Sequence, residues 1–126
     1  MKNGVVIFWV AILAVIVLGF GSTFFLKSGP GQLDTFAMCL KDKGVIFYGA
    51  FWCPHCQNTK KMFGKSAKLL PYVECSTPDG KGQLQICKDK NIQNYPTWVG
   101  PMSTSTLTGE RTLQELSDFS GCPLPQ

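Results

Sequence analysis

The stretch Val45-Ile-Phe-Tyr-Gly-Ala-Phe-Trp-Cys-Pro-His-Cys56 decides the fold of this chain. Residues 45–49 form a continuous apolar, β-rich run, which is typical of a strand buried on both faces. Two cysteines separated by two residues follow, and apolar residues then recur at helical spacing as far as Leu70, before Pro71. The pattern predicts a buried strand, a turn, and a helix that begins at the cysteine pair.

The cysteine pair indicates redox chemistry. Cys53 would lie at the helix N-terminus, where free backbone N–H groups and the positive end of the helix dipole favour the thiolate, the nucleophile of disulfide exchange. Pro54 suits the first helical position, and Cys56 lies one turn on, where it can close a disulfide with Cys53. His55 is the single histidine of the chain, and its partial charge would stabilise the thiolate further; the alternative is an exposed residue of the first turn.

Helices and strands are predicted to alternate on both sides of this stretch. The order favours an α/β domain over residues 32–126 whose first two strands are parallel. The last helix begins with a capping box, Thr112 and Glu115. The other expected elements are helices at 33–40 and 83–90 and strands at 72–75, 95–99 and 103–108.

The N-terminal part of the 126-residue chain is a separate appendage. Residues 4–26 contain no ionisable side chain and are numerous enough to cross a hydrocarbon core of about 30 Å. We therefore expect a transmembrane anchor over residues 1–27 and a linker at 28–31; a cleaved signal peptide is the alternative. The charges flanking the anchor leave its orientation ambiguous.

Composition bounds the location and the partners. Six cysteines in so short a chain favour an oxidising compartment, so we expect the N-terminus to be cytoplasmic and the domain to be extracytoplasmic. An apolar content of 44% argues against disorder. The net charge is only +4, and basic residues are not interleaved with aromatic ones, so we expect no binding of nucleic acid.

The buried strand, Trp52, the Cys53-Pro-His-Cys56 motif and the later Tyr95-Pro-Thr97 together resemble the thioredoxin superfamily. Residues 47–56 with Tyr72-Val-Glu-Cys75 are similar to the thioredoxin-like domain fused to bacterial and plant homologues of vitamin K epoxide reductase. This resemblance implies a central mixed four-stranded sheet flanked by helices. It also implies a cis Tyr95–Pro96 bond, with Pro96 facing Cys53, and binding of a peptide substrate by Trp52, Tyr95, Pro96 and Thr97.

The resemblance implies a thiol–disulfide oxidoreductase. Together with the expected anchor it gives a membrane-anchored enzyme, for which we expect no cofactor. Cys53 would form a mixed disulfide with a protein thiol and Cys56 would resolve it. We expect the chain to oxidise extracytoplasmic proteins and to be re-oxidised by a quinone-linked membrane protein of the vitamin K epoxide reductase type. Phe47 stands where classical thioredoxins carry a buried Asp, which weakens the case for a general reductase.

Three other functions stay open at this point. The first is a disulfide reductase or isomerase, for example in cytochrome maturation. The second is a module that binds a soft metal through Cys53 and Cys56. The third is a structural domain that disulfides hold together without turnover.

Four further cysteines allow three connectivities. We expect Cys75–Cys87, which would close a loop between a strand and a helix, and Cys39–Cys122, which would close most of the domain. Buried free thiols and a second redox-active pair are the alternatives.

Overall fold

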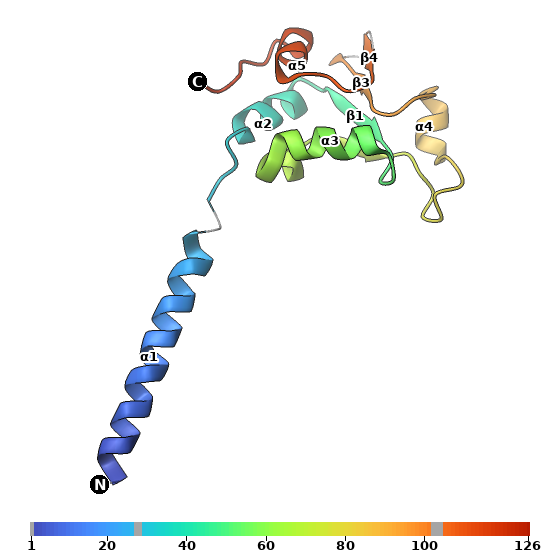
Figure 1. Cartoon of the computed structure of the whole chain (residues 1–126). Helices are drawn as coiled ribbons and strands as arrows, with labels where there is room; N and C mark the ends of the chain where they lie inside the picture. The colour runs from blue at the N-terminus through green and yellow to red at the C-terminus, as the bar shows by residue number, and fades with distance from the viewer. Residues whose placement is uncertain (1, 27–28, 102–104) are drawn as a thin grey trace. The chain divides into compact units, whose positions relative to one another are not determined.

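The computed structural model describes residues 2–26, 29–101 and 105–126. The chain divides into two compact units, Met1–Pro30 and Gly31–Gln126. The first unit holds helix α1 (Lys2–Leu26), and the second holds all the other elements (Figure 1). The boundary falls within the predicted linker 28–31, of which residue 28 lies outside the described residues.

The prediction of a transmembrane anchor in the N-terminal segment is wrong. A membrane crossing needs about 20 consecutive apolar residues in one helix. Over residues 2–26, 29–101 and 105–126, no helix meets the combined requirement of length and apolar character for a membrane span. This finding overturns the prediction of an N-terminal transmembrane helix within residues 1–27.

The second unit is built on a four-stranded mixed sheet in the order β2-β1-β3-β4. The strand β1 (Ile46–Gly49) pairs in parallel with β2 (Tyr72–Glu74) and antiparallel with β3 (Thr97–Val99). Strand β4 (Thr106–Thr108) pairs antiparallel with β3. The predicted start of this last strand, at residues 103 and 104, lies outside the described residues. The sheet and its helices fit a thioredoxin-like α/β fold.

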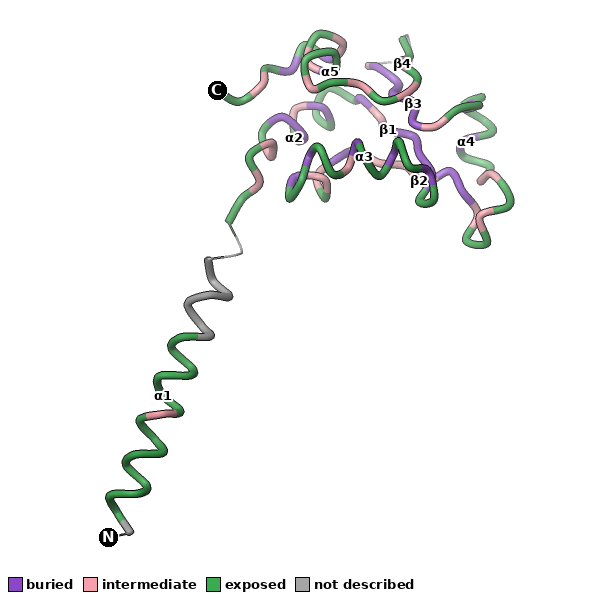
Figure 2. Tube along the Cα trace, in the orientation of Figure 1, coloured by how far each residue is buried: buried purple, intermediate pink, exposed green. Residues whose placement is uncertain are grey.

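Neighbouring residues of β1 point to opposite faces of the sheet and enter two separate cores. On one face Phe47 stacks on Trp98 with ring centroids 4.5 Å apart, and both pack with helices α2 (Asp34–Asp42), α3 (Pro54–Phe63) and α5 (Leu113–Ser120). On the other face Tyr48 packs with Cys87 of the short helix α4 (Gln85–Asp89). Buried residues therefore run along β1 and β3, the two inner strands of the sheet (Figure 2).

The helix after the cysteine pair is shorter than predicted. Helix α3 ends at Phe63, and a 3₁₀ helix, η1 (Gly64–Leu69), follows it. Gly64 has a φ of 54° and a ψ of −126°, a conformation that glycine adopts far more easily than other residues and that ends the α-helical hydrogen-bond ladder. Apolar spacing alone did not reveal this break, because the buried residues continue on the same side of the chain.

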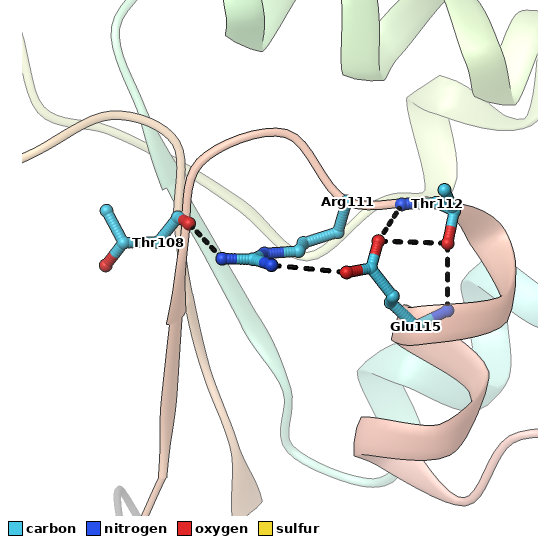
Figure 3. Close-up of polar contacts among 4 residues, drawn as sticks. All are labelled: Thr108, Arg111, Thr112 and Glu115. Atoms are coloured by element: carbon cyan, nitrogen blue, oxygen red, sulfur yellow. Dashed lines mark hydrogen bonds and ion pairs between the residues drawn. The ribbon is translucent and has the colours of Figure 1, made fainter.

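The capping box predicted for the last helix is present. The Thr112 hydroxyl accepts a hydrogen bond from the Glu115 backbone N–H at 3.1 Å, and the Glu115 carboxylate accepts one from the Thr112 N–H at 2.7 Å. Arg111 bonds the same carboxylate at 3.2 Å and donates to the Thr108 carbonyl (Figure 3). The end of β4 is thereby tied to the start of α5.

Two disulfides hold the outer elements, and both have the pairing expected from the sequence. Cys39 of α2 is joined to Cys122, after α5, with a Cα–Cα distance of 5.9 Å. Cys75, after β2, is joined to Cys87 of α4 with a Cα–Cα distance of 5.6 Å. Cys53 and Cys56 are free thiols.

Candidate redox site

Cys53 and Cys56 lie where the central strand passes into helix α3. A tight turn follows β1, in which the Cys53 N–H donates to the Ala50 carbonyl at 3.0 Å. Cys53 is the N-cap residue of α3, with extended backbone angles, and Pro54 is the first helical residue. The backbone N–H groups of the first helical turn have no partner within the helix. The Cys53 sulfur therefore lies at the positive end of the α3 dipole.

The two sulfurs differ in their access to solvent. Cys53 retains 5% of its surface, whereas Cys56 is fully buried. Burial raises the pKa of the Cys56 thiol to about 12, and the hydrogen bond and the charge of Cys53 add to this effect. A hydrogen bond from the Ala50 backbone and the charge of Lys60 act in the opposite direction. At neutral pH the reduced Cys56 is therefore a protonated thiol.

Gly49 makes room for Cys56. A Cβ atom on Gly49 would lie 2.9 Å from the Cys56 sulfur and 2.9 Å from the Cε2 atom of Tyr72. Both distances are shorter than the contact distance of about 3.5–4.0 Å between non-bonded carbon atoms. The last residue of β1 must therefore lack a side chain for the sulfur and the ring to occupy their positions. This requirement was not predicted from the sequence, although a glycine at the end of an apolar strand is a signal for close approach.

The segment before β3 lies against Cys53. The Tyr95–Pro96 peptide bond is cis, as the resemblance implied. The Cys53 thiol donates to the Tyr95 carbonyl at 3.7 Å, so the residue that precedes the cis bond is in direct contact with the sulfur. Thr97 is 6% exposed, and its hydroxyl donates to the Asn94 carbonyl at 2.7 Å. The structure brings Tyr95 to Cys53, while the Thr97 hydroxyl is occupied within its own turn.

Trp52 is held in place beside the cysteines. Its indole N–H donates to the Ser76 hydroxyl at 2.8 Å, and its ring meets Tyr95 edge-on with centroids 6.1 Å apart. Trp52 and Phe51 nevertheless each keep 49% of their surface exposed. Two large apolar side chains thus face solvent next to Cys53.

Glu74, which the sequence analysis did not single out, fixes the turn that carries these aromatic residues. Its Oε1 atom accepts hydrogen bonds from the backbone N–H groups of Phe51 at 3.2 Å and Ser76 at 2.8 Å. Its Oε2 atom accepts the Tyr72 hydroxyl at 2.7 Å. One carboxylate therefore links β2 to the turn before Cys53.

His55 has a partner that the sequence did not reveal. Its Nδ1 atom lies 2.5 Å from the Glu110 Oε2 atom, and both side chains are exposed, with 63% and 43% of their surface accessible. Glu110 lies on the loop after β4, 55 residues away in the sequence. Only the tertiary structure brings this carboxylate to His55, one of the two residues between the cysteines.

The described part of the chain offers no group of ligands that would support binding of a soft metal through Cys53 and Cys56. Over residues 2–26, 29–101 and 105–126, no three His, Cys, Asp or Glu side chains are grouped so that they could hold a metal ion. Four of the six cysteines are committed to disulfides and are not available as thiolate ligands.

The fold and the site together define a class. A free cysteine pair at the N-terminus of a helix, beside a cis-proline segment on a mixed four-stranded sheet, is a dithiol site on a thioredoxin-like domain. No family model matches the chain.

Among curated proteins, the chain is similar to the thiol-disulfide oxidoreductase LTO1 of Arabidopsis thaliana, with 46% identity over 92 residues. The match covers 69% of this chain and 24% of LTO1, so the chain spans about a quarter of that relative's length. The similarity supports a thiol–disulfide oxidoreductase.

Proposed function

We propose that this chain exchanges disulfides with protein thiols through Cys53 and Cys56 and that it acts as an oxidant of those thiols. The observation that carries the proposal is the asymmetry of the pair. Cys53 lies at the positive end of α3 with part of its surface accessible, and Cys56 lies fully buried one turn later. Of the two residues, only Cys53 retains exposed surface.

The exchange proceeds in two steps. A substrate thiolate attacks the Cys53 sulfur of the Cys53–Cys56 disulfide, so that a bond between the substrate and Cys53 forms and the disulfide bond breaks. The electron pair of the broken bond goes to the Cys56 sulfur, which takes up a proton because its pKa in this site is about 12. A second substrate thiolate then attacks the first substrate sulfur and releases Cys53. The substrate leaves oxidised, and the pair is reduced by two electrons.

The peptide substrate binds along the segment that flanks Cys53. The Tyr95 carbonyl accepts a hydrogen bond from the Cys53 thiol, so the Tyr95 backbone lies close enough to that sulfur to pair with a bound peptide. Thr97 is already paired with both neighbouring strands, and the Pro96 carbonyl accepts a hydrogen bond from the Gly109 N–H. Trp52 offers an exposed apolar surface on the same side. Recognition through backbone and apolar contacts suits an enzyme that acts on unfolded chains of many sequences.

Pro54 and His55, the residues between the two cysteines, tune the reduction potential of the pair. A charged imidazole near the Cys53 thiolate stabilises the reduced form and thereby makes the disulfide more oxidising. The contact between the His55 Nδ1 atom and the Glu110 carboxylate holds the His55 side chain at the surface beside the motif.

Re-oxidation requires an electron acceptor, because each turnover leaves two electrons on the pair. We assign this role to a quinone-linked membrane protein of the vitamin K epoxide reductase type, on the basis of the resemblance of residues 47–56 and 72–75. The place of action is an extracytoplasmic, oxidising compartment. The two additional disulfides, Cys39–Cys122 and Cys75–Cys87, support this placement, since such bonds are rare where thiols are kept reduced.

Two measurements test the proposal. The Cys56→Ser variant is expected to accumulate a mixed disulfide with a reduced, unfolded protein substrate, and the Cys53→Ser variant is expected to form none while keeping the wild-type urea midpoint. Exchange that survives in Cys53→Ser would refute the assignment of Cys53. The reduction potential of the pair decides the direction: a value of about −120 mV supports an oxidant, and one of about −270 mV indicates a reductase.

A further inference from the structure

Lys60 occupies a specific place behind the redox pair. It lies on α3 four residues after Cys56, so the two side chains are on the same face of the helix. It is only partly exposed, and its Nζ atom lies 3.4 Å from the centroid of the Tyr72 ring. An ammonium at this distance over an aromatic face is held by attraction to the ring's π electrons.

The ring that holds Lys60 is also a wall of the Cys56 pocket. The edge of Tyr72 and the Cys56 sulfur both lie 2.9 Å from the position that a Cβ on Gly49 would occupy. Phe47 packs edge-on against the same ring with centroids 5.1 Å apart, which limits its movement. The Lys60 charge is thereby fixed close to a sulfur that has no exposed surface.

Negative charge must appear on the Cys56 sulfur during exchange, and burial of that sulfur disfavours the charged form. Burial raises the pKa of Cys56 to about 12, while the charge of Lys60 lowers it. The other charged or titratable groups near this pocket are Cys53, Tyr72 and Glu74. Burial and the hydrogen bond to Glu74 raise the pKa of Tyr72, which therefore stays a neutral donor. The Glu74 carboxylate is itself occupied by three hydrogen-bond donors.

We propose that Lys60 is a positioning residue for disulfide exchange, whose ammonium on the Tyr72 ring stabilises negative charge on the Cys56 sulfur. The inference rests on the proposed function. When a substrate thiolate bonds to Cys53, the Cys53–Cys56 bond breaks and its electron pair goes to Cys56, which then takes a proton from water. Lys60 lowers the energy of the transition state in which that charge builds up. The same stabilisation applies in reverse, when Cys56 attacks a mixed disulfide at Cys53.

The test uses the oxidised full chain and reduced glutathione as the attacking thiol. A nearby opposite charge changes the stability of a thiolate by about tenfold or more, and exchange rates follow about half of that effect on a logarithmic scale. Because the charge of Lys60 is the smallest of the causes that shift the Cys56 pKa, the lower end of this range applies. Lys60→Met is therefore expected to slow reduction of the Cys53–Cys56 disulfide by about threefold. Lys60→Arg should restore the rate to within about twofold of wild type. Lys61→Met, which removes an exposed charge from the next position of the same helix, is the matched control and should leave the rate unchanged.

The possible results distinguish a failure of the proposed function from a failure of the role assigned to Lys60. A wild-type disulfide that glutathione does not reduce would refute the proposed function itself. A reactive wild type with an equally fast Lys60→Met would overturn the role of Lys60 alone. Equal slowing in Lys60→Met and Lys60→Arg would also overturn it, because the charge would then not be the property that matters. Urea unfolding checks the fold of each variant, and Lys60→Gln replaces the Met variant if that one fails to fold.

Discussion

The close approach of three groups at Gly49 leads to the sharpest prediction, for the Gly49→Ala variant. The added methyl group would lie 2.9 Å from both the Cys56 sulfur and the Tyr72 ring. Neither neighbour can retreat easily, because Cys56 is fully buried on α3 and Tyr72 packs against Phe47. Overpacking of this kind costs about 1–3 kcal/mol. Replacing a strand glycine by alanine returns about 0.5–1 kcal/mol of backbone entropy. We expect a net destabilisation of about 1–2 kcal/mol.

Urea unfolding measures this loss, and the rate of reduction by glutathione measures its effect on the site. The displaced Cys56 sulfur should also make exchange slower than in wild type. Gly29→Ala is the control, because a Cβ there meets no atom within 4 Å and the residue lies outside the unit that carries the site. Its stability should stay within about 0.5 kcal/mol of wild type. A Gly49→Ala protein with wild-type stability and a wild-type rate of reduction would contradict the prediction, because the pocket would then have room for the added methyl group.

Three further predictions concern the stability of the second unit. Thr112→Ala removes the N-cap of α5 and should cost about 1 kcal/mol in urea unfolding; an unchanged midpoint would mean that the cap is redundant. Hydrogen bonds from the Thr112 backbone and side chain, and from Arg111, lower the pKa of Glu115 below its usual 4.5. The resulting stabilisation is therefore present above about pH 4.5 and lost as the pH falls through the lower pKa of the folded state, and Glu115→Gln should lack this part of the acid dependence. The double variant Cys39→Ala/Cys122→Ala opens a loop with a sequence separation of 83 and should lose about 4 kcal/mol; a loss below about 1 kcal/mol would contradict the role of this bond.

Local patterns predicted much of the second unit correctly. The apolar run 45–49 became the central strand, the cysteine pair became the start of a helix, and Thr112 with Glu115 became a capping box. Each of these rests on interactions within a few residues or on burial of a strand on both faces, so the neighbouring sequence contains the information. The break at Gly64 shows the limit of such patterns, since a helical spacing of apolar residues continues through it.

The N-terminal segment shows a different limit. A run of apolar residues predicted a transmembrane helix over residues 1–27, and in the described part of the chain no helix meets the requirement for a membrane span. The apolar run did predict the helix itself, because α1 covers Lys2–Leu26. Helix formation is a local property, whereas a membrane span must satisfy a length and an apolar character together.

The sequence by itself determined the position of the two cysteines at a helix N-terminus and the strand that leads to them, because both follow from short-range order. The tertiary structure alone decided what surrounds the sulfurs. Glu110 reaches His55, Glu74 holds the turn before Cys53, and Tyr72 carries Lys60 beside the buried Cys56. The first two of these contacts join residues far apart in the chain, and the third depends on the pairing of β2 with β1. No local pattern records such contacts, because they arise only when the sheet and helices pack and burial sets the charge that each group can bear.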